Sequence, residues 1–179
     1  MIIAIISSFC AYANFNISWS GFLKHPDEVS LANVEESIIT SVKQCGWGKN
    51  VNKAVISIDV GQKLFKYIKE GNEFAFKVGL IVVPCLDGGE LEDFYRSAAR
   101  FFEINPIKLL ALIKQQEITD EEYERIIVML QEESTDNKKL SILIIEKRIE
   151  MLSEINQPKF DNLIKLGLKM LREILSQIK

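Results

Sequence analysis

The sequence predicts an α/β fold, in which a small mixed sheet of three or four strands packs against helices and an all-helical second half follows. Apolar runs rich in β-branched and aromatic residues at 1–8, 54–60 and 74–83 are typical of buried strands. Apolar residues spaced by three and four between these runs indicate helices. Beyond Asn105 the sequence contains helical patterns only. A ferredoxin-like arrangement is the main alternative topology.

The chain begins with an isoleucine-rich run at 1–8, which predicts a central strand. Residues 11–26 follow no regular pattern, although they contain several aromatic side chains. Ser30 can then cap a helix that Gly46 ends. The apolar positions of this helix are Leu31, Val34, Ile38, Ile39, Val42 and Cys45.

A short helix lies between the next two predicted strands. Gly61 ends the strand at 54–60, and the helix that follows ends at Gly71. Apolar residues alternate from Phe74 to Leu80, so the sequence predicts a third strand over 74–83. The apolar positions of the helix that follows this strand are Leu91, Phe94, Tyr95, Ala98, Phe101 and Phe102.

The second half carries several helix-start signals. Pro106 suits the first turn of a helix, and Thr119 with Glu122 forms a capping box. We therefore divide the chain into an α/β part at 1–104 and a helical part at 105–179, which share one core. The expected starts of the later helices are Thr135 or Asp136, and Pro158.

Composition narrows the classes of partner. The chain has 179 residues, 47% of them hydrophobic, and a net charge of −3. We do not expect nucleic acid to be the main partner, because binding to phosphates requires a basic surface. The high apolar content instead favours a protein partner or a homo-oligomer.

The metal-binding residue types are few. The three cysteines, Cys10, Cys45 and Cys85, fit no metal or redox spacing, and His25 is the single histidine. We therefore expect no metal and no cofactor. The sequence also lacks the glycine-rich nucleotide loops and the serine and zinc hydrolase motifs.

The first residues allow two interpretations of the cellular compartment. A buried strand is favoured because no Lys or Arg precedes Lys24, and it predicts a cytoplasmic protein. In the alternative, the apolar run is a leader that is cleaved near Ala13, and the exported protein carries a Cys45–Cys85 disulfide. No other run approaches the ~20 apolar residues of a transmembrane helix.

The candidate catalytic residues are carboxylates at predicted strand ends and the single histidine. Asp59, Asp87 and Glu90 follow apolar runs, and α/β sheets bind ligands at such edges. A pair of these carboxylates would serve a cation or acid–base chemistry. Glu90 with Asp87 can equally cap a helix start.

The tripeptide His25-Pro26-Asp27 resembles the signature loop of J-domain co-chaperones. The preceding residues lack the charged helix of that family. The alternative is a turn in which proline fixes φ and Asp27 or Ser30 caps the next helix.

Large apolar side chains are candidate partner-binding residues, since such residues serve as interface anchors or cover a core. These residues are Trp19, Trp47, Phe160 and Leu171. The sequence thus favours a non-enzymatic protein-binding or regulatory module that acts through a helical or apolar surface. A small-ligand binder or hydrolase-type enzyme with carboxylates at strand ends, and an exported protein with a cleaved leader, are the alternatives.

Overall fold

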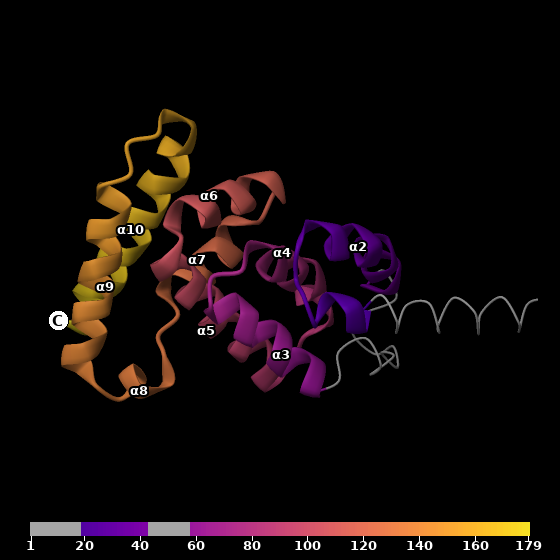
Figure 1. The fold of residues 1–179 in the computed structure, drawn as a ribbon. Helices are drawn as coiled ribbons and strands as arrows, with labels where there is room; N and C mark the ends of the chain where they lie inside the picture. The colour runs from indigo at the N-terminus through magenta and orange to yellow at the C-terminus, as the bar shows by residue number, and fades with distance from the viewer. Residues whose placement is uncertain (1–18, 43–57) are drawn as a thin grey trace, which may run out of the picture.

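The computed structural model describes residues 19–42 and 58–179, whose regular structure is helical throughout. α9 and α10 lie side by side at one end of the molecule, α2 lies at the other, and α3, α4 and α5 lie between them (Figure 1). Residues 19–22 are also helical and precede α2. The helices are α2 (Glu28–Val42), α3 (Ile58–Lys69), α4 (Glu73–Val82), α5 (Gly88–Ile104), α6 (Pro106–Gln115), α7 (Asp120–Val128), α8 (Glu132–Thr135), α9 (Lys138–Ser153) and α10 (Asp161–Ile178), with 3₁₀ turns η1 (Val83–Cys85) and η2 (Pro158–Phe160).

The predicted strand over 74–83 is wrong, because this segment forms α4 and the first residue of η1. α4 buries six of its ten residues, so apolar side chains occupy most of its circumference. A short apolar run of this kind does not distinguish a buried helix from a buried strand. The side chain of Asn72 caps the first turn of α4, which favours the helix.

The predicted strand over 54–60 is also wrong where it can be compared with the structure, because α3 begins at Ile58. Residues 54–57 and the predicted strand at 1–8 lie outside the described residues. Within 19–42 and 58–179 there is no strand, so the predicted α/β class with its mixed sheet of three or four strands is wrong, and this part of the chain is helical.

Two of the four helix-start signals of the second half are confirmed, and Pro158 begins the 3₁₀ turn η2 just before α10 rather than α10 itself. α6 begins at Pro106, and Thr119 and Glu122 form the expected capping box at the start of α7. The start of α9 was placed wrongly, because Asn137 rather than Thr135 or Asp136 accepts the capping hydrogen bond. The division of the chain after residue 104 stays a prediction.

A stack of aromatic rings joins α4 to α5. The rings of Phe76 and Phe101 lie 4.5 Å apart between centroids, and Phe94 stacks on Phe76 at 6.3 Å. All three side chains are fully buried. They belong to one continuous cluster of buried apolar residues that extends from Trp19 to Leu171. Burial of rings of this size is a main source of stability for such a core.

One charged side chain is fully buried in this core. Arg148 of α9 donates from Nη2 to Glu103 of α5 at 2.7 Å. Its Nη1 donates to the carbonyl oxygens of Ile127 and Met129, both at 2.8 Å. Burial lowers the pKa of Arg148, and the hydrogen bond with Glu103 works in the opposite direction. This group therefore joins α5, the end of α7 and α9.

Candidate functional site

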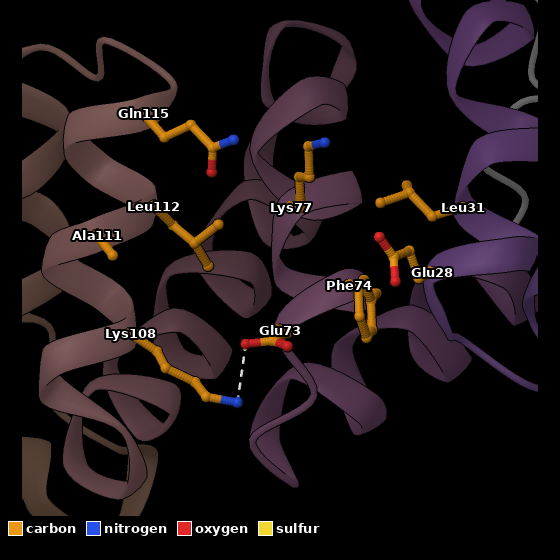
Figure 2. Close-up of a pocket in the computed structure, with 9 residues that line it drawn as sticks. All are labelled: Glu28, Leu31, Glu73, Phe74, Lys77, Lys108, Ala111, Leu112 and Gln115. Atoms are coloured by element: carbon orange, nitrogen blue, oxygen red, sulfur yellow. Dashed lines mark ion pairs between the residues drawn. The ribbon is translucent and has the colours of Figure 1, made fainter.

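A groove lies between α2, α4 and α6 and has a volume of about 310 Å³. Figure 2 shows α4 in the middle, with side chains of α2 on one side and of α6 on the other. Within each helix the earlier lining residues lie lower in this view, so the three helices run in the same general direction along the groove. The lining residues are Glu28, Leu31, Glu73, Phe74, Lys77, Lys108, Ala111, Leu112 and Gln115.

The start of α4 is tied to the turn before α2. Asn72 caps α4, because its Oδ1 accepts a hydrogen bond from the Ala75 N–H at 2.8 Å. The Nδ2 of the same side chain donates to the carbonyl oxygen of Pro26 at 2.9 Å. One amide therefore fixes two helix starts relative to each other.

The start of α6 is tied to the turn before α4. Asn105 donates from Nδ2 to the carbonyl oxygen of Gly71 at 3.2 Å. Gly71 has a φ of +86°, which glycine adopts without strain. A Cβ at this position would lie 2.9 Å from Asn105 Nδ2 and 3.0 Å from Ile104 Cγ2. Glycine is therefore required for this close approach between the turn before α4 and the start of α6.

The start of α2 has its own reciprocal cap, as expected for Asp27 and Ser30. Asp27 accepts from the Ser30 N–H at 2.8 Å, and Ser30 Oγ accepts from the Asp27 N–H at 3.0 Å. The hydrogen bond from the Ser30 backbone lowers the pKa of Asp27. The cap places Glu28 in the first turn of α2, at the edge of the groove.

Two ion pairs lie along the groove. Lys108 of α6 contacts Glu73 of α4 at 2.8 Å, drawn as a dashed line in Figure 2. Lys77 of α4 contacts Glu35 of α2 at 3.0 Å. Each pair spans two of the helices that line the groove. Four apolar side chains line the groove among these charged groups, and we call them the apolar strip: Leu31, Phe74, Ala111 and Leu112.

The carboxylates that were predicted to lie at strand ends lie instead in helices or at a helix start. Asp87 is the exposed N-cap residue of α5, but its side chain makes no capping hydrogen bond, and Glu90 lies in the first turn. Asp59 belongs to α3, and its side chain lies outside the described part of the chain. In the described ranges, no group of three or more histidine, cysteine, aspartate or glutamate side chains is placed to hold a metal ion.

His25 lies in the exposed turn before α2. Its carbonyl oxygen accepts a hydrogen bond from Ser30 Oγ at 2.6 Å. The tripeptide that it begins therefore takes part in the turn and in the cap of α2. This arrangement agrees with the interpretation as a turn.

The predicted partner-binding side chains are buried within the chain. Trp19, Phe160 and Leu171 expose at most 3% of their surface and belong to the core cluster. Trp47 lies outside the described residues. The three buried side chains therefore contribute to the core rather than to an exposed surface.

The sequence analysis missed the groove residues, because it expected a strand where α4 lies. The signal that could have found α4 is Asn72 followed by Glu73, since an asparagine cap and an acidic first turn mark a helix start. Lys77, the single charged residue over 74–83, marks the side of α4 that faces its ion-pair partner on α2.

Comparisons of the chain with protein-family models, with curated proteins and with solved structures found no match. Among the described helices, none combines the length and apolar character required to cross a membrane.

Proposed function

We propose that this protein is a non-enzymatic binding module that accepts a segment of a partner protein in the groove between α2, α4 and α6. The observation that carries the proposal is the apolar strip of Leu31, Phe74, Ala111 and Leu112, which lies among charged side chains. Grooves of this kind accept the apolar face of an amphipathic helix, whose anchors repeat every three or four residues.

The chemistry of the lining favours binding of a chain segment over binding of a small molecule. Small-molecule sites direct a few polar groups toward the ligand and occupy about 300–1,000 Å³. This groove is near the lower limit of that range. Its lysines contact Glu73 and Glu35 rather than converging on the space between them. The apolar strip is therefore the main attraction that the groove offers.

The proposal is tested with a displayed library of random 12-residue peptides and two variants. Ala111 is exposed in the groove, so Ala111→Arg fills the strip with a charged side chain. The control is Asn33→Arg, which places the same side chain at an exposed position of α2 that does not line the groove. We expect selected peptides to lose at least about tenfold in affinity on Ala111→Arg, equal to about 1.4 kcal/mol.

The control variant should bind these peptides like the original protein. A library that yields no peptide sensitive to Ala111→Arg would contradict the proposed function. A homodimer detected by light scattering and dispersed by Ala111→Arg would show that the groove serves self-association instead of a different partner.

The cellular compartment is a separate proposal. Cys85, the last residue of η1, is disulfide-bonded. Disulfides persist in oxidising compartments and are rare in the cytosol. We therefore propose that the protein functions in an oxidising compartment, which favours the exported alternative over the cytoplasmic expectation. The other two cysteines, Cys10 and Cys45, lie outside the described residues, and their pairing stays a prediction.

A further inference from the structure

The charges of the groove are compensated at all but one lining position. Lys108 pairs with Glu73, and Lys77 pairs with Glu35, so both lysines have a carboxylate within 3.0 Å. Glu28 also lines the groove, and within the described ranges it takes part in no ion pair. The side chain of Glu28 therefore supplies the uncompensated charge of the groove, and this charge is negative.

The position of Glu28 suits recognition of a ligand more than support of the fold. Its side chain is exposed, and the cap of α2 is made by Asp27 and Ser30 without it. The oxygens of Glu28 therefore stay open to a ligand.

The apolar strip begins beside this charge. Leu31 lies one turn along α2 from Glu28, and Phe74 lies on α4 between the two walls (Figure 2). Leu31 is 5% exposed and forms the floor, whereas Phe74 and Leu112 are half-buried and leave apolar surface open. A segment that covers the strip therefore brings its flanking residues close to the Glu28 carboxylate.

We infer that the occupant of the groove is a basic amphipathic segment of a partner protein, an inference that rests on the proposed binding function. Apolar side chains of the segment cover Phe74 and Leu112, and a lysine or arginine beside them pairs with Glu28. Charge complementarity at the rim of an interface sets partner choice and association rate more than total affinity. Glu28 therefore determines which segments are accepted, and the apolar strip holds them.

The test asks whether reversal of the charge at position 28 also reverses the charge of the peptides that the groove selects. The peptide library is selected in parallel against the original protein and against Glu28→Lys, at low salt because exposed charges are screened at high salt. The control is Glu132→Lys, which reverses an exposed acidic residue in the first turn of α8, outside the groove. Circular dichroism melting checks that each variant folds, and Glu28→Gln replaces Glu28→Lys if the latter does not.

We expect the original protein and the control to select peptides with lysine or arginine at a fixed distance from the apolar residues. Glu28→Lys should select aspartate or glutamate there, and it should bind the basic peptides about 5- to 10-fold more weakly. With Glu28→Gln the basic preference should disappear.

Three results would overturn the inference, and they differ in what they say of the proposed function. If the selected peptides respond to Ala111→Arg but show no charge preference that follows Glu28, the groove binds segments and only the inference fails. If no selected peptide responds to Ala111→Arg, the inference fails together with the proposed function. A homodimer that Ala111→Arg disperses also contradicts the inference, because the occupant is then a second copy of this chain.

Discussion

Arg148, which is fully buried, forms a charge pair with the largely buried Glu103, and a second cation lies on the outer side of this pair. Glu103 Oε1 accepts from Arg148 at 2.7 Å, and its Oε2 accepts from the half-exposed Arg100 at 2.8 Å. Removal of one partner from a buried pair leaves an uncompensated charge in a medium that solvates it poorly. The two members of the pair are therefore expected to respond differently to substitution, because only Glu103 has a second partner of opposite charge.

We expect Glu103→Gln to lower the free energy of unfolding by about 3–5 kcal/mol, since Arg148 then lacks a counter-charge. Arg148→Met should lower it less, because Arg100 still neutralises Glu103. Urea denaturation followed by circular dichroism measures both values. The control is Glu146→Gln, which breaks an exposed pair with Lys179 and should change the value by at most about 1 kcal/mol. Equal effects of Glu103→Gln and of the control would refute a stabilising role for the buried pair.

Gly79 allows α4 to approach its neighbours closely. A Cβ at this position would lie 2.7 Å from a ring carbon of Phe94 and 2.8 Å from Ile68 Cδ1. We expect Gly79→Ala to lower the free energy of unfolding by about 1–3 kcal/mol through overpacking, reduced by the better helix propensity of alanine. Gly89→Ala in the first turn of α5 is the control, because no atom lies within 4 Å of its Cβ position. A thermal melt in which both variants match the original protein would contradict this packing.

Tyr123 should make the protein sensitive to alkali. Burial raises the pKa of its hydroxyl, which donates to the carbonyl oxygen of Leu163 at 3.2 Å. The folded state therefore keeps its proton where the unfolded state releases it. The stabilisation is complete below pH ~10, the ordinary tyrosine value, and is lost as the pH rises above it, by at most about 1.4 kcal/mol per pH unit.

Tyr123→Phe separates this effect from other groups that titrate in the same range. At pH 7 the variant should be less stable by about 0.5–1.5 kcal/mol, because the hydrogen bond to Leu163 is lost. Between pH 10 and 11 its free energy of unfolding should fall less steeply than that of the original protein. Parallel slopes from urea denaturation at both pH values would exclude a contribution of Tyr123.

The disulfide of Cys85 should be visible in the purified protein. We expect Cys85 to resist alkylation by iodoacetamide until a reductant is added. Peptide mapping by mass spectrometry should show it linked to Cys45, the pairing that belongs to the exported alternative. Removal of a native disulfide typically lowers stability by about 2–5 kcal/mol, so reduction should lower the melting temperature. Alkylation of Cys85 in the folded, unreduced protein would contradict both the bond and the proposed compartment.

Local signals in the sequence predicted much of the helical structure but did not predict the fold class. The capping box of Thr119 and Glu122 was correct, because it depends on neighbouring residues only. α4 was missed, because the alternation of Phe74, Phe76 and Val78 fits a strand as well as a helix that is buried on most sides. Tertiary packing around α4 decided the conformation.

The candidate site was harder to predict from the sequence than the helices were. The groove combines α2, α4 and α6, and no single segment carries a signal that these helices meet. Asn72 and Asn105 bring them together through hydrogen bonds to Pro26 and Gly71, which are distant in sequence. The burial of Trp19 in the core likewise depends on residues far from it in the chain.

Two hydrogen bonds, from Asn72 to Pro26 and from Asn105 to Gly71, make the groove a suitable starting point for redesign, and we call them the asparagine ties. In both ties the acceptor is a backbone carbonyl oxygen, so the ties do not involve the exposed side chains that line the groove. These side chains can therefore be varied near the three helix starts. Residues such as Glu28, Ala111 and Gln115 are exposed and could be randomised together without touching the ties. A library built in this way would retain the scaffold while it samples new specificities.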